Sequence, residues 1–213
     1  MNNILFDFDG TICDTSPGIF ASMQKVCDHY SLPYKEDTFV KMIGPSLKES
    51  FSTIFHLPES EINNAIKVYR DFYSVEGMFM CEPYDGVPKL LRDLRDAGKK
   101  ILVATSKPEH FTKKIIERKG LSHLFDFIGG ADMEEQKRIS KIDVINYVLK
   151  ENKIEDLRET IMVGDRFYDV DGAHMAGLKA IGILWGFGSE AEFIKCGADY
   201  ICESPLDVKK ILL

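Results

Sequence analysis

The chain has 213 residues with a formal net charge of -7, and 45% of its residues are hydrophobic. It is long enough for one large domain, or for a domain that carries an insert, and it can bury a sizeable core. The negative charge argues against nucleic acid as the main partner, because a phosphate backbone demands a basic protein surface.

The first predicted element is a buried strand over residues 4–6, a short apolar run of the kind found in the middle of a parallel sheet. The segment Asp7-Phe8-Asp9-Gly10-Thr11 follows it directly. Residues two apart on a strand point the same way, so Asp7 and Asp9 would place two like charges in one small region. Burying both is unfavourable unless a cation or donors compensate, and Mg²⁺ suits an oxygen-rich site that also binds phosphate. The alternative is a solvated Asp-Gly turn.

The next stretch, to about residue 80, has a helical pattern. Apolar residues recur there at steps of three and four, as on one face of a helix, at Phe20, Met23, Cys27, Tyr30, Leu47, Phe51, Ile54, Phe55, Ile62, Ile66, Tyr69 and Tyr73. Turn-rich segments border this stretch at residues 15–18 and 81–86. We therefore expect an all-helical insert over residues 15–81, within a core formed by residues 1–14 and 82–213.

From residue 87 the predicted helices and strands alternate. Helices are expected over 87–94, 109–119, 142–149, 169–176, 191–196 and 206–212, and strands over 101–105, 127–128, 160–164, 180–184 and, at an edge, 199–201. Alternation of this kind is typical of a parallel sheet with crossover helices. The sequence therefore predicts an α/β fold with a Rossmann-like parallel sheet as its core.

Two more of these strands end in polar residues. One runs into Thr105-Ser106-Lys107 and the other into Gly164-Asp165, with Asp169 close behind. Open parallel α/β sheets bind ligands at the carboxyl ends of their strands. The hydroxyl groups and the lysine can bind phosphate oxygens, and Asp165 adds a third carboxylate for a hard cation. Lys141, at a predicted helix start, could also reach an anion.

Taken together, these segments resemble the four ordered motifs of the haloacid dehalogenase superfamily. The matching residues are Asp7 to Thr11, Thr105 to Lys107, Lys141, and Gly164 to Asp169. Segments 83–87 and 185–189 are similar to the phosphoglycolate phosphatase-like branch of that superfamily. One departure from the pattern is that Ile142 follows Lys141, where the superfamily often has proline. Lys137 therefore competes with Lys141 for the role of the third motif.

The resemblance implies a phosphatase that uses Mg²⁺ and acts on a small phosphorylated metabolite. Asp7 would be the nucleophile and would form an aspartyl-phosphate. Asp9 would protonate the leaving group, later activate water, and lend its backbone carbonyl to the metal. Asp165 would be the other carboxylate ligand of the metal besides Asp7, and Asp169 an auxiliary ligand.

The remaining motif residues would bind the substrate. The resemblance implies that Thr105, Ser106 and Lys141 hold the phosphoryl oxygens, and that the helical insert is a cap that selects the substrate. In the cap, Gly44 and Ser46 belong to a segment similar to the substrate-specificity loop of the superfamily. The alternative is that this segment is an ordinary break between two helices. Lys107 is a further candidate for specificity, or else, like Arg166, a surface or structural charge.

Several alternatives remain open at this stage. Phosphoglycolate is the leading substrate by resemblance, and a 5′-nucleotidase acting on nucleoside monophosphates comes next. A phosphosugar mutase would share every core motif. A dehalogenase is disfavoured because Asp9 is present, and a non-enzymatic phosphate-binding module is disfavoured because Asp7, Asp9 and Asp165 are intact. A receiver-type signalling domain would need only about half this length.

The cellular setting is expected to be the cytoplasm. The five cysteines are scattered and form no CxxC pair, as is typical of thiols in a reducing compartment. The first strand begins at once after Met1-Asn2-Asn3, which leaves no room for a signal peptide, and no apolar run approaches the ~20 residues that span a membrane. We expect a monomer or homodimer that contacts neither membrane nor nucleic acid.

Overall fold

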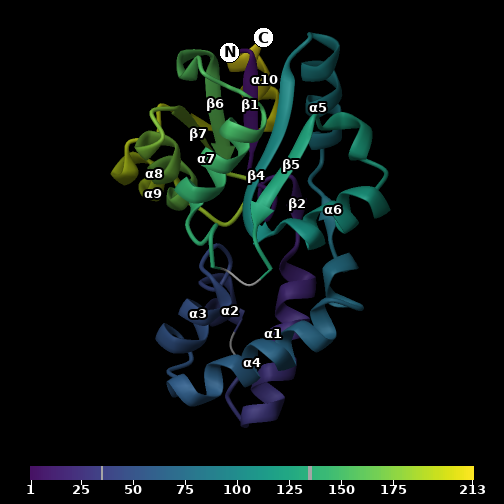
Figure 1. Cartoon of the computed structure of the whole chain (residues 1–213), viewed down its shortest axis with the longest axis vertical. Coiled ribbons are helices and arrows are strands. Elements are labelled where there is room, and N and C mark those ends of the chain that lie inside the picture. The colour runs from purple at the N-terminus through teal and green to yellow at the C-terminus, as the bar shows by residue number, and fades with distance from the viewer. Residues whose placement is uncertain (35, 134–135) are drawn as a thin grey trace. The chain divides into compact units, whose positions relative to one another are not determined.

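The computed structural model describes residues 1–34, 36–133 and 136–213, and the chain divides into two compact units (Figure 1). One unit consists of Met1–Asp14 and Pro83–Leu213, and the other of Thr15–Glu82. Two short strands, β2 (Cys13–Asp14) and β3 (Glu82–Pro83), form a two-stranded sheet where the chain passes from one unit to the other and back.

The larger unit is built on a six-stranded sheet in the order β5-β4-β1-β6-β7-β8. Its strands are β1 (Asn3–Phe6), β4 (Lys100–Pro108), β5 (Phe127–Ala131), β6 (Thr160–Gly164), β7 (Lys179–Ile183) and β8 (Tyr200–Cys202). All neighbouring pairs are parallel, and β1 lies at the centre with Leu5 opposite Leu102 of β4 and Met162 of β6. The predicted α/β fold with a parallel sheet is confirmed.

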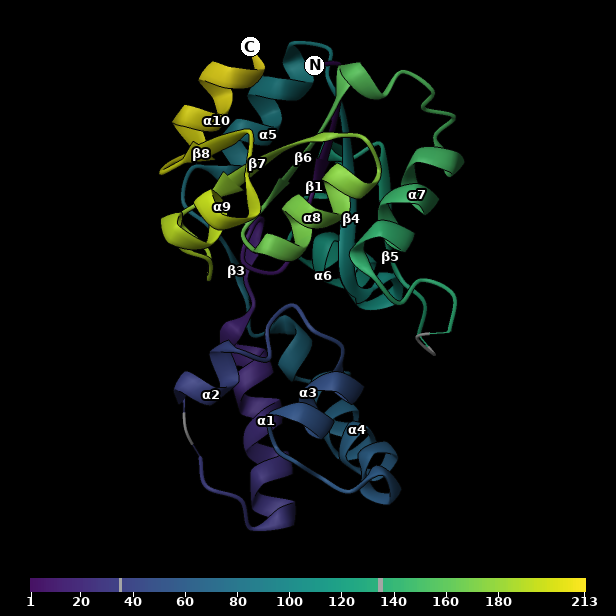
Figure 2. The same ribbon diagram turned by 90° about the vertical axis from the view of Figure 1, so that its left-hand side faces the viewer.

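Helices cover both faces of this sheet, as Figures 1 and 2 show. The helices of this unit are α5 (Val87–Asp96), α6 (Glu109–Arg118), α7 (Lys141–Glu151), α8 (Phe167–Met175), α9 (Glu190–Cys196) and α10 (Pro205–Leu212), with 3-10 turns η2 (Ser122–Leu124) and η3 (Leu157–Glu159). Alternate strand residues such as Leu5 and Met162 share one buried core with Val144 of α7, Val170 of α8 and Phe193 of α9. Burial on both faces explains why the strands read as continuous apolar runs.

Strand β4 differs from the expectation at its carboxyl end. The apolar run predicts a strand that ends at Thr105, whereas β4 continues to Pro108, with a shift in its pairing to β5 between those two residues. Such an irregularity redirects the side chains that follow it. Ser106 and Lys107 therefore belong to an irregular strand end instead of a loop.

The smaller unit is all helical. It contains α1 (Ser16–Tyr30), α2 (Glu36–Val40), α3 (Leu47–Thr53), α4 (Glu59–Tyr73) and the 3-10 turn η1 (Gly77–Phe79). Its core includes the buried side chains of Met23, Phe39, Phe51 and Ile62. No helix among the described residues of either unit is long and apolar enough to cross a membrane.

Candidate active site

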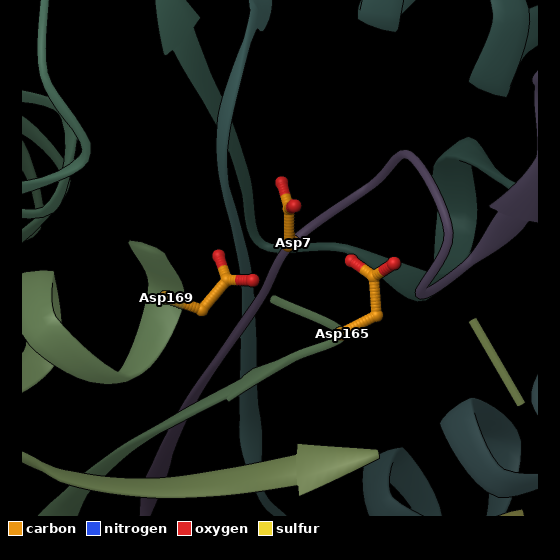
Figure 3. Close-up of side chains that lie close together, drawn as sticks. All are labelled: Asp7, Asp165 and Asp169. Atoms are coloured by element: carbon orange, nitrogen blue, oxygen red, sulfur yellow. The ribbon is translucent and has the colours of Figure 1, made fainter. Parts of the chain in front are cut away.

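Three buried carboxylates gather at the carboxyl ends of β1 and β6. Asp7 follows β1 directly, Asp165 follows β6, and Asp169 lies in the first turn of α8. One oxygen of each lies within 4.8 Å of the others, and among the described residues they form the acidic group that could hold a metal ion (Figure 3). The parallel pairing of β1 with β6 brings these residues together from opposite ends of the sequence.

Asp7 is fixed by hydrogen bonds to its backbone and side chain and by an ion pair. Its backbone N–H donates to the carbonyl oxygen of Val163, 2.9 Å away, and its side chain is hydrogen-bonded by the hydroxyl of Thr105. Its Oδ1 atom lies 2.9 Å from Nζ of Lys141. Burial raises the pKa of the Asp7 carboxyl above its ordinary value, and the Lys141 ammonium opposes this effect. A carboxylate fixed in this way can act as a nucleophile or as a metal ligand.

Lys141 contacts two members of this cluster. Its Nζ atom lies 2.9 Å from Oδ1 of Asp7 and 2.7 Å from Oδ1 of Asp169, and it donates to the carbonyl oxygen of Ala104 at 3.2 Å. Burial alone would lower the pKa of this ammonium, but the charges of Asp169 and Asp7 raise it above its ordinary value. The lysine therefore stays charged. Lys137, its competitor for the third motif, has an exposed side chain.

The start of α7 sets the position of Lys141. Ser140 caps the helix by accepting from the backbone N–H of Asp143, and the Asp143 carboxylate accepts from the N–H of Ser140. This capping box satisfies two backbone donors and fixes where the helix begins. Lys141 is the first residue of that helix, so the cap determines where its side chain enters the cluster.

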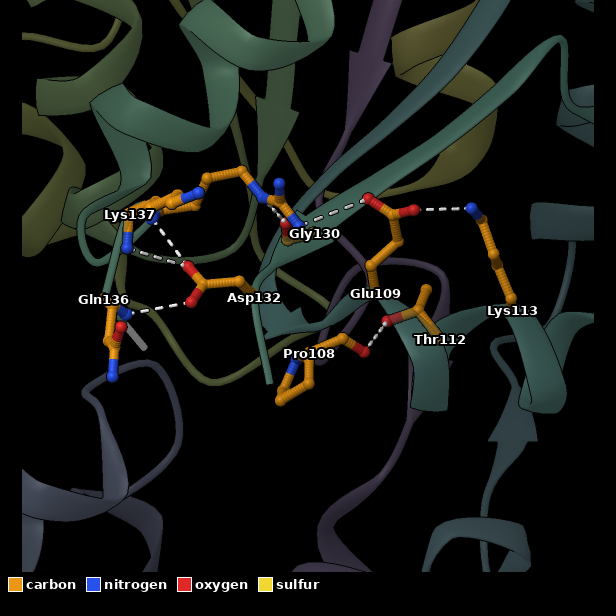
Figure 4. A network of polar contacts seen from close by, with 9 residues as sticks. Pro108, Glu109, Thr112, Lys113, Gly130, Asp132, Gln136 and Lys137 are labelled. Carbon is orange, nitrogen blue, oxygen red and sulfur yellow. Dashed lines mark hydrogen bonds and ion pairs between the residues drawn. The ribbon is translucent and has the colours of Figure 1, made fainter. Parts of the chain in front are cut away.

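The segment before α7 is tied down by a polar network (Figure 4). The carboxylate of Asp132 accepts backbone hydrogen bonds from Gln136, Lys137 and Arg138, at distances of 2.9, 3.1 and 2.7 Å. These bonds fix residues 136–138, which lie just before Lys141, to the Asp132 carboxylate. Asp132 was not among the predicted functional residues, although aspartate commonly accepts such backbone hydrogen bonds.

Arg138, one of these residues, also contacts three other elements. Its Nε atom donates to the carbonyl oxygen of Gly130 at 2.6 Å, and its Nη2 atom lies 3.7 Å from Oε2 of Glu109. Its guanidinium also lies 4.2 Å from the ring centre of Tyr147 on α7. These contacts attach residues 136–138 to the end of β5, to α6 and to α7.

Asp165 is almost completely buried, and both of its carboxylate oxygens have a donor. The backbone N–H of Phe187 donates to Oδ2 at 2.9 Å, and the hydroxyl of Thr11 lies 3.4 Å from Oδ1. Burial, reinforced by the charges of Asp169 and Asp7, raises the pKa of Asp165 well above its ordinary value. Like charges this close together favour a bound cation.

Asp9 occupies a different environment from Asp7. Its Oδ2 atom lies 2.9 Å from Nζ of Lys107, and the two side chains are 16% and 5% exposed. The interpretation of Lys107 as a surface charge is therefore wrong, because its side chain is buried beside the first motif. The ion pair connects the segment after β1 with the irregular end of β4.

The charges of the site fit one divalent cation. Three carboxylates, those of Asp7, Asp165 and Asp169, face the ammonium group of Lys141. Two negative charges remain, which one divalent ion would neutralise. Carboxylate oxygens are the ligands that Mg²⁺ prefers, so the donor set and the charge both match that ion.

One of the predicted phosphate-binding residues, Thr105, lies next to Asp7. Thr105 is buried, and its Oγ1 atom accepts from the backbone N–H of Lys107 at 3.2 Å. Ser106 is half-buried in the same irregular end of β4. Since Thr105 also hydrogen-bonds to Asp7, this strand end borders the acidic cluster, and its role in phosphate binding stays a prediction.

Arg166 has a structural partner. Its Nε atom lies 3.0 Å from Oε1 of Glu192, which also accepts from the backbone N–H of Phe167 at 2.7 Å. Glu192 was not predicted to belong to the site. The spacing Ser189-x-x-Glu192, typical of a helix start, is the signal in the sequence that marks it.

Gly44 and Ser46 lie between α2 and α3 of the helical unit. Gly44 has a φ angle of 111°, a backbone conformation that favours glycine. Ser46 caps α3 by accepting from the backbone N–H of Glu49 at 3.2 Å. Both residues therefore have a local role in the break between the helices, and their role in specificity stays a prediction.

Comparison with known proteins finds one family over most of the chain. The model of a family described as "Haloacid dehalogenase-like hydrolase" matches residues 4–183. The match begins in β1 and ends with β7, so it includes all four motif segments.

The curated relatives have several different names. Tyrosine-protein kinase PtkA of Mycobacterium tuberculosis is 38% identical over 193 residues, which are 90% of this chain and 64% of that protein. The chain thus spans less than two thirds of the length of that relative. A 5′-nucleotidase of Pseudomonas aeruginosa is 30% identical over 99% of this chain and 95% of its own length. A phosphoglycolate phosphatase of Aquifex aeolicus is 29% identical over 100% of this chain and 97% of its own length.

Solved structures give the same fold. The crystal structure of a predicted phosphatase from Clostridium acetobutylicum superimposes with a TM-score of 0.93 at 37% identity. The match covers 99% of this chain and 97% of that one. The similarity therefore extends over both units of the chain.

Proposed function

Because the chain belongs to the haloacid dehalogenase-like hydrolase family, we propose that it is a phosphatase that uses Mg²⁺ and hydrolyses a small phosphate monoester through an aspartyl-phosphate. The observation that carries this proposal is the buried cluster of Asp7, Asp165 and Asp169 with Lys141 bound to two of its members. Phosphoryl transfer depends mainly on positioning and charge stabilisation, which a fixed carboxylate, an ammonium and a cation site supply.

Asp7 is the nucleophile in this proposal. One of its carboxylate oxygens attacks phosphorus, and the bond between phosphorus and the leaving oxygen breaks. A covalent intermediate divides one difficult step into two easier ones. Water then attacks the phosphorus of the aspartyl-phosphate, which releases inorganic phosphate and restores Asp7.

Asp9 moves the protons. It gives its proton to the leaving oxygen in the first step and takes one from the attacking water in the second, so it ends each cycle protonated again. Help of this kind contributes roughly 10²- to 10⁴-fold to a rate. Lys107, 2.9 Å from Oδ2 of Asp9, fixes the orientation of that carboxyl group.

The phosphoryl oxygens need positive charge and donors. Lys141 and Thr105 both contact Asp7, so each lies beside the position of a phosphorus atom that Asp7 attacks. Asp7, Asp165 and the backbone carbonyl of Asp9 would hold Mg²⁺, with Asp169 as an auxiliary ligand. When bound, the ion offsets the repulsion between the carboxylate and the phosphate.

The leading substrate class is a small phosphorylated acid such as phosphoglycolate, followed by nucleoside monophosphates. The relatives named phosphoglycolate phosphatase and 5′-nucleotidase, at 29% and 30% identity over nearly their full lengths, support these two candidates about equally. We assign the helical unit, Thr15–Glu82, as the cap that selects between them. The cytoplasm is the proposed location, since none of the five cysteines, all among the described residues, forms a disulfide.

A second candidate is transfer of the phosphoryl group to an acceptor other than water. The relatives named tyrosine-protein kinase are 38% identical to this chain over 90% of its length. Both candidates need the same cluster and differ in which group receives the phosphoryl group.

A screen of small phosphate esters with Mg²⁺ tests the proposal. Release of inorganic phosphate is expected, with phosphoglycolate or a nucleoside monophosphate among the best substrates. Conversion of a sugar phosphate to its isomer without free phosphate would identify a mutase instead. Labelling of a tyrosine substrate without phosphate release would favour the second candidate.

A further inference from the structure

We propose that segment 185–192 is a positioning element that holds the carboxylate of Asp165 in the orientation needed to bind a divalent cation. Gly186 and Glu192 are its decisive residues. This inference rests on the cation site proposed above, and it assigns a role to a segment that contributes no ligand of its own.

The segment follows β7 and passes beside the two strand ends that carry the acids. The indole Nε1 of Trp185 donates to the carbonyl oxygen of Thr11, 3.0 Å away. Thr11 lies in the turn after β1, and its hydroxyl lies 3.4 Å from Oδ1 of Asp165. Trp185 thus ties the segment to the same turn that contacts one oxygen of Asp165.

The segment contacts the other oxygen of Asp165 directly. The backbone N–H of Phe187 donates to Oδ2 at 2.9 Å. With one donor at each oxygen, the plane of the carboxylate is set from two sides. A backbone donor is well suited to this task, because its direction is fixed by the path of the chain and not by a rotamer.

Three glycines enclose Asp165 closely. A Cβ atom at Gly186 would overlap the side chain of Asp165 and the carbonyl oxygen of Gly10, and one at Gly188 would overlap the backbone oxygen of Asp165. Gly10, whose φ angle is 78°, approaches Oδ2 of Asp165 from the turn after β1. A side chain at Gly10 or Gly186 would displace the carboxylate of Asp165, and one at Gly188 would displace its backbone.

Glu192 fixes the residues that follow Asp165. Its Oε1 atom accepts from Nε of Arg166 and from the backbone N–H of Phe167, at 3.0 and 2.7 Å. It thereby satisfies a backbone donor at the start of α8 and holds Arg166 and Phe167, the two residues after Asp165. The segment therefore fixes both the carboxylate of Asp165 and the backbone that follows it.

This support matters because Asp165 has two like-charged neighbours. Its carboxylate oxygen lies within 4.8 Å of those of Asp7 and Asp169, so repulsion favours rotation of the side chain out of the cluster when no cation is present. Groups that orient ligands in this way typically contribute about 10- to 100-fold to metal affinity. Segment 185–192 supplies that orientation before the cation arrives.

The test is to measure Mn²⁺ binding by electron paramagnetic resonance. The signal gives the concentration of free Mn²⁺, so the measurement does not depend on enzymatic turnover. We expect Gly186→Ala and Glu192→Ala each to raise the dissociation constant by about tenfold or more. Glu192→Gln should regain most of the affinity, because its amide oxygen can still accept from Phe167. Gly129→Ala is the control, since the nearest atoms to its added methyl belong to Val148, Phe127 and Val103 and none belongs to Asp165.

Each outcome separates this inference from the proposed function. If folded Gly186→Ala and Glu192→Ala both bound Mn²⁺ within twofold of the wild-type affinity, the proposed role of the segment would be overturned. This would hold even if the protein were an active phosphatase. If Gly186→Ala did not fold, Glu192→Ala against Glu192→Gln would decide. If Gly129→Ala lost as much Mn²⁺ affinity, the loss would be explained by general destabilisation of the protein, which would contradict the proposal. Absence of Mn²⁺ binding in the wild type would refute the cation site itself.

Discussion

The ammonium of Lys107 lies 2.9 Å from the carboxylate of Asp9, and both side chains are largely shielded from solvent. The pair joins residues 98 positions apart, one after β1 and one near the end of β4. Removing one partner of a buried ion pair is strongly unfavourable, because the other charge is left without compensation. Lys107 therefore connects the stability of the site with the orientation of the proposed acid.

The first prediction concerns this pair. Lys107→Met should lower kcat for an alkyl phosphate by about tenfold or more, because Asp9 would no longer be oriented toward the leaving oxygen. An aryl phosphate, whose leaving group needs little protonation, should lose less. Lys107→Arg keeps the charge, so its kcat should fall between those of the wild type and Lys107→Met. The same loss for alkyl and aryl substrates would show that Lys107 does not act through Asp9.

The second prediction separates the two acids of the first motif. Asp7→Asn should abolish both turnover and the phosphoenzyme, since it removes the nucleophile. Asp9→Asn keeps the nucleophile and should slow turnover by roughly 10²- to 10⁴-fold. Mass spectrometry of acid-quenched enzyme measures the phosphoenzyme directly. Near-normal rates in Asp7→Asn would show that another group attacks phosphorus.

The third prediction concerns the balance between the acids and the cation. Mg²⁺ should raise the melting temperature of the wild type, because an ion that binds only the folded state stabilises it by about 2.7 kcal/mol at 100 times its Kd. Asp165→Asn should melt higher than the wild type in a chelator, since it removes one of three crowded charges and keeps an acceptor for Phe187. It should gain little from Mg²⁺. Calorimetry in both buffers measures the difference, and an Asp165→Asn protein that Mg²⁺ stabilises as strongly as the wild type would contradict the ligand assignment.

The fourth prediction is a pH dependence at Asp132, which accepts hydrogen bonds from the backbone just before Lys141. Hydrogen bonds from the backbone of Gln136 and then Arg138 lower the pKa of Asp132 to about 2. A lowered folded-state pKa adds stability that is fully present above the unfolded value of 3.8 and is lost as the pH falls toward 2. The stability advantage of the wild type over Asp132→Asn should therefore be constant above about pH 4 and shrink below it. Urea unfolding between acid and neutral pH measures this, and a constant difference over the whole range would refute the charge effect.

The sequence predicted the sheet because its physical signature is local. Each central strand is buried on both faces, so it appears as an apolar run, and each run ends where polar residues begin. Since parallel strands end at the same edge, the sequence alone is enough to expect that Asp7 and Asp165 meet there. Lys141 could be expected at a helix start because it comes directly before an apolar pattern with helical spacing.

Other features of the site depend on long-range packing and left little local signal. The pairing of Lys107 with Asp9 follows from the irregular end of β4, which no apolar pattern reveals. The bond from Phe187 to Asp165 is made by a backbone N–H, which almost any residue type could have provided. Closely packed glycines such as Gly186 are visible in the sequence, but their partner is visible only in the structure.

The last prediction concerns the proposed cap. Ser46→Ala removes the hydroxyl that caps α3, and Ser204→Ala removes the matching hydroxyl that caps α10 in the larger unit. Each change should lower the free energy of unfolding by about 1 kcal/mol, so the two variants are matched in stability. If the segment around Ser46 contacts substrate, Ser46→Ala should change the ratio of kcat/KM between phosphoglycolate and a nucleoside monophosphate, and leave turnover of a small aryl phosphate nearly unchanged. Ser204→Ala should leave that ratio as it is. An unchanged ratio in Ser46→Ala would limit this serine to its role as a helix cap.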